Sequence, residues 1–134
     1  MPTKEQGKRN RRIGQKGEVL IAMRLQALGY NVVFTEDNAP YDFEAHGPAG
    51  LLFIEAKTSR GGYRSNKNEY RYQANIRNQA ADVIIWLLLA NGQEHYFIIP
   101  KTEIDQKILT ISSKNPAKTR GKFKKFYNRW DYLQ

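Results

Sequence analysis

The chain has 134 residues, of which 40% are hydrophobic and 26% charged, and it contains no cysteine. This length fits one domain with one sizeable core, and the hydrophobic content excludes a wholly disordered chain. The longest apolar run, residues 83–90, is eight residues long, well short of the roughly 18 that a membrane-spanning helix needs. Without cysteine there are no disulfides, thiolate metal sites or cysteine nucleophile. With no signal-peptide pattern either, we expect a cytoplasmic protein, in a prokaryotic cytoplasm or nucleoid.

Positive charge is concentrated at the two ends of the chain, which carries a net charge of +9. Residues 1–16 hold six Lys or Arg and one Glu, and residues 114–129 hold seven Lys or Arg and no acidic residue. We expect a single domain with a basic arm at 1–12 and a basic, aromatic tail at 114–134. Clustered cations suit a phosphate backbone. A solubilising surface is the alternative, and neither end has the clean apolar face of a membrane-surface helix.

The apolar pattern predicts an α/β fold, with a mixed β-sheet flanked by helices. In chain order it predicts a helix at 14–28, strands at 30–35, 41–46 and 51–58, a polar loop at 59–68, a helix at 69–81, strands at 83–89 and 95–99, a short helix at 101–107 and an edge strand at 108–112.

Three local signals support this α-β-β-β-α-β-β order. The second helix is inferred from Tyr72, Ile76 and Ala80, which would share one helical face. The unalternating run at 83–89 indicates a central strand buried on both faces, and Asn91-Gly92 predicts a hairpin turn. In the tail, Trp130 and Leu133 are expected to pack onto the core rather than to stack on bases.

The hairpin around residues 47–50 carries the most informative pattern. Symmetric pairing across this turn matches residues whose numbers sum to 97, so Asp42 lies opposite Glu55 on the same face, with Cβ atoms ~5 Å apart. Two facing carboxylates repel each other, and a divalent cation would relieve that repulsion. Mg²⁺ prefers hard oxygen ligands, commonly one or two carboxylates with water and a substrate phosphate. The register therefore predicts a metal site.

Two further charged residues adjoin this site. Lys57 projects from the same strand face as Glu55, which brings together the groups that phosphodiester hydrolysis needs. A structural salt bridge of Lys57 with Glu55 or Asp42 is the alternative. Glu18 borders the core-facing stripe of the first helix, where a carboxylate needs a partner, although a solvated glutamate favoured by the helix dipole would also fit.

Together these residues resemble the PD-(D/E)XK nuclease superfamily. The resemblance rests on Lys16-Gly17-Glu18, Pro40-Tyr41-Asp42 and Glu55-Ala56-Lys57, and it spans roughly residues 14–99. Within that superfamily, the stretches at 61–64 and 96–100 are similar to small homing-type endonucleases. The size and the basic ends resemble archaeal Holliday-junction resolvases.

The resemblance implies a restriction-endonuclease-like fold and a Mg²⁺-dependent endonuclease, with Mn²⁺ as a substitute metal. Asp42 and Glu55 would be metal ligands, together with the backbone carbonyl of Ala56. Lys57 would orient or polarise the attacking water, and Glu18 would hold a water of the metal or a second ion. The expected catalytic residues are therefore Asp42, Glu55, Lys57 and Glu18. Gln73, in the predicted second helix, could also face the site.

DNA is the expected partner. The residues expected to contact it are all basic and lie in the arm, in the loop after the catalytic strand and in the tail: Lys8, Arg9, Arg11, Arg12, Arg60, Arg64, Lys67, Lys122, Lys124 and Lys125. Cleaving both strands of a duplex needs two active sites, so we expect a homodimer or homotetramer. The leading hypothesis is a site-specific enzyme of homing or restriction type. A junction resolvase and a non-catalytic nucleic-acid-binding protein on the same scaffold are the alternatives.

Overall fold

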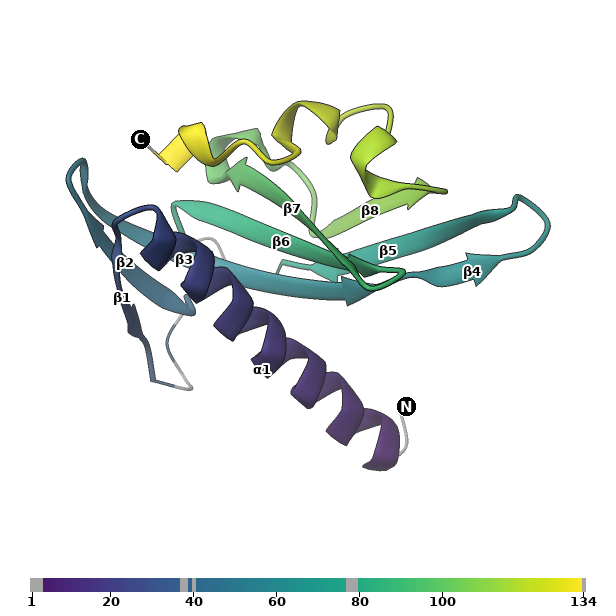
Figure 1. Ribbon diagram of the computed structural model, residues 1–134, viewed down its shortest axis with the longest axis horizontal. Coiled ribbons are helices and arrows are strands. Elements are labelled where there is room, and N and C mark those ends of the chain that lie inside the picture. The colour runs from purple at the N-terminus through teal and green to yellow at the C-terminus, as the bar shows by residue number, and fades with distance from the viewer. Residues whose placement is uncertain (1–3, 37–38, 40, 77–79, 134) are drawn as a thin grey trace.

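Figure 1 shows the protein as a computed structural model, which describes residues 4–36, 39, 41–76 and 80–133. Within these ranges one long helix and eight strands are followed by short 3₁₀ turns. The elements are α1 (Lys4–Ala27), β1 (Asn31–Phe34), β2 (Phe43–Gly47), β3 (Gly50–Arg60), β4 (Gly62–Arg64), β5 (Glu69–Asn75), β6 (Val83–Ala90), β7 (Gln93–Pro100), η1 (Lys101–Glu103), β8 (Ile108–Ser113), η2 (Pro116–Lys118), η3 (Lys124–Phe126) and η4 (Trp130–Leu133).

A mixed sheet of five strands forms the body, as the sequence predicts. Its strand order is β1-β2-β3-β6-β7, and β3 and β6 are parallel while the other neighbours are antiparallel. Strand β6 lies inside the sheet between β3 and β7 and is buried on both faces along most of its length, which explains its unalternating apolar sequence. Gly50 at the β2–β3 turn has φ 119°, and Asn91 and Gly92 both have positive φ at the β6–β7 turn, as a two-residue hairpin of this type requires.

Helix α1 begins ten residues earlier than the sequence predicts, so most of the expected N-terminal arm is helical. The reason is composition: Lys, Arg, Gln and Glu are strong helix formers, and their charge does not prevent an exposed helix. Residues 1–3 of the predicted arm lie outside the described residues. In Figure 1 the N-terminal half of α1 leaves the sheet and extends away from the body.

The predicted helix at 69–81 is wrong. Residues 69–75 form strand β5, which pairs with β4 and β8 in a second, three-stranded sheet of order β4-β5-β8. The sequence carries both periods here, since Tyr72 and Ile76 fit a helix while Tyr72, Ala74 and Ile76 fit a strand with alternate residues buried. Half of the predicted loop at 59–68 is also strand, because β3 runs on to Arg60 and β4 follows. Residues 77–79 lie outside the described residues.

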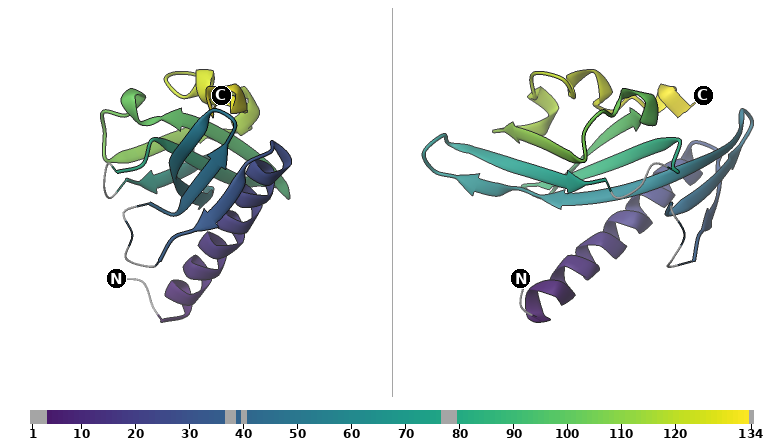
Figure 2. Two further views of the ribbon diagram at one scale, coloured as in Figure 1. Left: turned by 90° about the vertical axis from the view of Figure 1, so that its left-hand side faces the viewer. Right: turned by 180° about the vertical axis from the view of Figure 1, so that it is seen from behind.

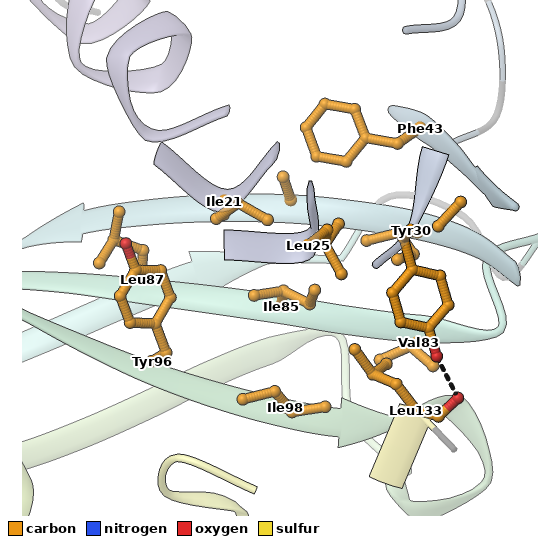
Figure 3. Close-up of a cluster of buried hydrophobic side chains, with 13 residues drawn as sticks. Ile21, Leu25, Tyr30, Phe43, Val83, Ile85, Leu87, Tyr96, Ile98 and Leu133 are labelled. Atoms are coloured by element: carbon orange, nitrogen blue, oxygen red, sulfur yellow. Dashed lines mark hydrogen bonds between the residues drawn. The ribbon is translucent and has the colours of Figure 1, made fainter. Parts of the chain in front are cut away.

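The two faces of the main sheet cover two separate hydrophobic clusters. On one face, α1 contributes Ile21 and Leu25, which Figure 3 shows lying over Ile85 of β6. In the same cluster the hydroxyl of Tyr30 donates a 2.7 Å hydrogen bond to the carbonyl of Leu133, so the C-terminus is attached to the core as predicted.

The opposite face packs against the second sheet and the C-terminal turns, through Trp86, Tyr72, Phe97 and Phe126 among others. Figure 2 shows this layering from two more sides, with α1 on one side of the sheet and the C-terminal segment on the other. The tail predicted to be basic and aromatic is thus folded onto the body, with Phe123 and Phe126 buried beneath its lysines. No helix in the described ranges is long and apolar enough to cross a membrane.

Candidate active site and nucleic-acid interface

The predicted hairpin register is confirmed up to the last paired residues. Strands β2 and β3 pair with residue numbers that sum to 97, from Gly47↔Gly50 to Phe43↔Ile54. Asp42 lies just beyond this ladder. Its backbone N–H donates to the Ile54 carbonyl at 2.9 Å, and its carboxylate Oδ2 accepts a 2.7 Å hydrogen bond from the N–H of Ala56. The Asp42 carboxylate is therefore fixed beside the Glu55-Ala56-Lys57 segment.

Glu55 and Lys57 project from the face of β3 that looks away from α1. Their register partners on β6 are Ile84 and Trp86, which belong to the cluster on that face. Glu55 is only 6% exposed, and its Oε1 lies 3.4 Å from Nζ of Lys57. Since a buried carboxylate needs a compensating charge, this ion pair holds the ammonium group within the site. It is also the salt bridge that the sequence left open as an alternative.

Burial and the neighbouring cation act on Asp42 in opposite directions. Burial raises the pKa of the Asp42 carboxyl above its ordinary value of 3.8, against the Ala56 hydrogen bond and the charge of Lys57, which both lower it. The charge of Lys57 thus lowers the pKa of Asp42 in addition to pairing with Glu55. Asp42, Glu55 and Lys57 therefore form one electrostatic unit, which we call the carboxylate–lysine trio.

The backbone of Ala56 also faces this unit. In a strand, the N–H and C=O of one residue point to the same edge, so the Ala56 carbonyl points to the edge on which its N–H meets Asp42. Two carboxylates and one carbonyl are a suitable partial ligand set for Mg²⁺, which completes its shell with water and phosphate. No group of three or more His, Asp or Glu side chains that could hold a metal exists among the described residues.

Glu18 lies on the opposite side of β3 from Glu55 and Lys57. Helix α1 packs on the face of β3 that carries Ile54, Ala56 and Thr58. The crossing is so close that a Cβ on Gly17 would lie 1.7 Å from the Thr58 hydroxyl oxygen, so only glycine fits there. Glu18 is half-buried next to this crossing. The structure thus brings Glu18 close to β3, and its catalytic role stays a prediction.

The basic residues that follow β3, which the sequence placed in a loop, lie on a β-hairpin. Arg60 ends β3, Arg64 ends β4, and Lys67 lies in the turn before β5. A groove of about 640 Å³ runs along this hairpin, and its lining includes Arg60, Arg64, Arg71 and Gln73. Arg71 was not among the predicted DNA contacts and Gln73 was misplaced, because residues 69–81 were predicted to be a helix. The alternation Tyr70, Tyr72, Ala74 was the signal that could have placed them.

The other predicted DNA contacts lie at the two ends of the chain. Lys8, Arg9, Arg11 and Arg12 belong to α1, and the structure does not describe their side chains. In the C-terminal segment Lys122 pairs with Asp105, and Lys125 lies 3.5 Å from Glu103. These two lysines are thus partly neutralised within the chain, whereas Lys124 forms no salt bridge among the described residues.

Each of the two histidines lies close to another polar side chain of the protein. His95 is buried, and its Nδ1 lies 3.0 Å from the hydroxyl of Tyr127. Burial lowers the pKa of His95, which favours its neutral form. His46 is exposed and lies 3.5 Å from Glu44.

Comparison with known proteins shows which fold the chain shares but does not show its family. No protein-family model matches the chain, and no curated protein matches it. Among solved structures, one described as a bacterial homing endonuclease, I-Ssp6803I, is similar with a TM-score of 0.68 and 15% sequence identity. The similarity covers 90% of this chain and 88% of that one. At this identity the likeness shows a shared fold, and it confirms the mixed sheet with a covering helix that the sequence predicts.

Proposed function

We propose that the protein is a Mg²⁺-dependent endonuclease that hydrolyses phosphodiester bonds in DNA at specific sites. The observation that carries the proposal is the carboxylate–lysine trio at the end of the β2–β3 hairpin, with Asp42 held by Ala56 at 2.7 Å and Lys57 held by Glu55 at 3.4 Å. A protein that only binds DNA gains nothing from two carboxylates kept close together, because they repel both each other and the phosphates.

The members of the trio would have separate roles in phosphodiester hydrolysis. Mg²⁺, which would be held by Asp42, Glu55 and the Ala56 carbonyl, supplies charge stabilisation and water activation when bound. The Lys57 ammonium group orients the attacking water or hydrogen-bonds the phosphate oxygen on which negative charge develops. Burial of Glu55 and partial burial of Lys57 strengthen these interactions, because water screens them less. Mn²⁺ would substitute, since it accepts the same oxygen ligands.

The surface next to the trio suits a nucleic-acid substrate. β2 pairs with β3 only as far as Ile54, and no described strand pairs with that edge of β3 at residues 55–60. Further along the same strand lies the hairpin groove with Arg60, Arg64 and Arg71, on the side of β3 opposite to Glu55 and Lys57. Among the described residues none of these arginines forms a salt bridge, so their charge is available to phosphate. Cutting both strands would require a homodimer or homotetramer.

Cleavage of a mixed DNA panel tests the proposal. The panel contains supercoiled plasmid, linear duplex and a four-way junction, each with and without millimolar Mg²⁺. We expect Mg²⁺-dependent cuts in duplex DNA at few positions. Selective cutting of the junction would indicate a Holliday-junction resolvase instead of a site-specific endonuclease. Tight binding with no cut in any substrate, in Mg²⁺ or Mn²⁺, would contradict the proposed activity and leave a DNA-binding protein.

A control separates the trio from general charge effects. Asp131→Asn removes a carboxylate from the C-terminal turn η4, which is far from the trio in sequence. There Asp131 lies 2.8 Å from Arg129. This variant should cleave like the parent, whereas Asp42→Ala and Glu55→Ala should lose cleavage.

A further inference from the structure

The residue after β1, Thr35, contacts the backbone on both sides of Asp42. It extends the β1–β2 register by one position beyond the pair Phe34↔Phe43. Its N–H donates to the carbonyl of Asp42 at 3.1 Å, and its hydroxyl Oγ1 donates to the carbonyl of Tyr41 at 2.5 Å. One residue therefore holds two successive carbonyls of the segment that leads into β2.

These two carbonyls belong to the two peptide units that flank the Cα atom of Asp42. The unit before that atom consists of the Tyr41 carbonyl and the Asp42 N–H, and this N–H donates to the Ile54 carbonyl at 2.9 Å. The unit is thus held by Thr35 on one side and by β3 on the other. The unit after the atom is held by the Thr35 N–H. Because each peptide unit is planar and a residue has only two soft backbone dihedral angles, these bonds restrict both angles of Asp42.

The side chain of Tyr41 gives the same segment a second contact with β3. Its ring stacks on the ring of Phe53, with centroids 4.4 Å apart, and Phe53 precedes Glu55 by two residues on the strand. The Thr35 hydroxyl is the side-chain contact on the β1 side. A substitution that removes this hydroxyl leaves the backbone pairs and the ring contact in place.

The backbone angles of Asp42 decide where its carboxylate lies. An aspartate has a single methylene between backbone and carboxylate, so a backbone rotation moves the carboxylate with it. Here the carboxylate Oδ2 accepts the Ala56 N–H at 2.7 Å, in the segment that carries Glu55 and Lys57. Since Mg²⁺ demands near-ideal octahedral geometry, a ligand that leaves this position is lost to the ion.

Threonine combines two properties that this position uses. Its branched Cβ suits extended backbone, and its hydroxyl is a donor, which valine, of nearly the same shape, lacks. The net contribution of one such hydrogen bond corresponds to roughly a 2- to 13-fold change in an equilibrium. That factor is the size of the effect that loss of the hydroxyl should have on the population of the placed carboxylate.

We propose that Thr35 is a positioning residue for the trio. Its hydroxyl and N–H hold the backbone of Asp42 so that the carboxylate stays on the Ala56 N–H, where it would bind the metal. Thr35 acts through Asp42. The consequence for the metal rests on the proposed function, whereas the position of the carboxylate does not.

Hydrogen exchange of the Ala56 amide, measured by NMR on the metal-free protein, tests the position of the carboxylate. Thr35→Val removes the hydroxyl, keeps the branched side chain and should speed exchange of this amide by roughly 2- to 13-fold. Thr35→Ser keeps a hydroxyl and should restore the parental rate. The amide of Ile85, a fully buried residue of β6, should exchange as in the parent, because it reports the stability of the core.

Binding of Mn²⁺ alone, followed without DNA by the EPR signal of the free ion, tests the consequence for the metal. An apparent affinity falls with the fraction of protein in the competent conformation, so Thr35→Val should weaken Mn²⁺ binding by roughly the same 2- to 13-fold. Thr35→Ser should bind like the parent. Thr110→Val, which removes a threonine hydroxyl from β8 in the second sheet, is the matched control and should change neither Mn²⁺ binding nor exchange at Ala56.

The outcomes separate the positioning role from the proposed activity. If Thr35→Val leaves exchange at Ala56 unchanged, or speeds it no more than at Ile85, Thr35 is structural only and the proposal fails. Thr35→Ala also lacks the hydroxyl, and a parental rate at Ala56 in that variant overturns the proposal even if valine packs poorly.

The metal arm has its own contradicting results. Parental Mn²⁺ affinity in a Thr35→Val protein that exchanges faster at Ala56 would overturn the role of Thr35 toward the metal. If exchange at Ala56 rises as expected while the parent protein neither binds Mn²⁺ nor cuts DNA, the positioning of the carboxylate stands and the proposed activity fails.

Discussion

Replacing Asp42 by asparagine should stabilise the metal-free protein while removing its response to Mg²⁺. Burial raises the pKa of Asp42 in spite of the Ala56 hydrogen bond and the nearby Lys57. Folding therefore shifts the balance of this group from the carboxylate toward the neutral carboxyl. An asparagine is neutral, and its amide oxygen can still accept the Ala56 N–H. Relief of the repulsion with Glu55 should increase the free energy of unfolding by about 0.5 kcal/mol, or about 2 °C in Tm for a chain of this size.

Alanine at the same position should act in the opposite direction. Asp42→Ala leaves the Ala56 N–H without its acceptor at 2.7 Å, and an unsatisfied buried donor costs about 1–3 kcal/mol. The expected order of unfolding midpoints without metal is therefore asparagine variant, then parent, then alanine variant.

With Mg²⁺ bound, the parent should have a higher Tm than the asparagine variant. A ligand that binds only the folded protein stabilises it by RT ln(1 + [L]/Kd), which is about 1.4 kcal/mol at ten times Kd. The parent should gain that amount with Mg²⁺ and overtake the asparagine variant, which has lost a charged ligand and should respond weakly. Thermal unfolding monitored by circular dichroism, with and without Mg²⁺, measures both effects. An equal Mg²⁺ response in parent and variant would refute the assignment of Asp42 as a ligand.

The same substitution has a defined pH dependence. Because the pKa of Asp42 is raised on folding, this carboxyl favours the folded state most below its ordinary value of 3.8. That contribution is lost as the pH rises through the higher value in the folded protein. Without metal, the advantage of Asp42→Asn over the parent should therefore be small at the acidic end and grow as the pH rises above 3.8. A constant difference across this range would show that Asp42 is not destabilised by ionisation.

Three further predictions concern residues around the trio and on α1. Lys57→Ala should lower the cleavage rate by several orders of magnitude and keep the Mg²⁺-dependent rise in Tm, because the ammonium group acts mainly in the transition state. A variant that keeps its turnover and loses only DNA affinity would show that Lys57 is a phosphate contact. Glu18→Gln should keep the helix, lower the rate less than Glu55→Ala does, and raise the Mg²⁺ concentration for half-maximal cleavage, whereas parental kinetics at limiting Mg²⁺ would reduce the site to the trio. Removal of residues 1–12 takes away five basic residues and should reduce the slope of log K against log salt in DNA binding by roughly 3–4; an unchanged slope would mean that this part of the chain does not contact phosphates.

The positions of the trio could be predicted from sequence because the information is local. The β2–β3 hairpin has a short turn with glycines at 47 and 50, and the chain pairs symmetrically around it. Once that register is fixed, Asp42 comes to the open end of the hairpin, beside the Glu55-Ala56-Lys57 segment. The sequence could not show that Asp42 leaves the ladder and bonds the Ala56 N–H through its side chain, because that depends on where the last strand pair breaks.

Strand β5 could not be predicted because the evidence for it is distant in the sequence. β5 is held on one side by β4 and on the other by β8, whose register partners start at Ile108. Local spacing was equally compatible with a helix, and only the contact with β8 and the burial of Tyr72 against Trp86 and Phe97 decide for a strand. The early start of α1 was hidden for a different reason, since a run of charged helix formers was interpreted as an arm because of its charge.

The most direct test of the catalytic trio is single-turnover cleavage of plasmid DNA by the parent protein and by Glu55→Gln, compared at saturating Mg²⁺. Glu55 is buried and paired with Lys57, and glutamine keeps its size while removing the charge. The trio predicts that the parent cleaves only with Mg²⁺ or Mn²⁺ and that Glu55→Gln loses at least a hundredfold in rate while still binding DNA. Near-parental cleavage by a folded Glu55→Gln protein would contradict it.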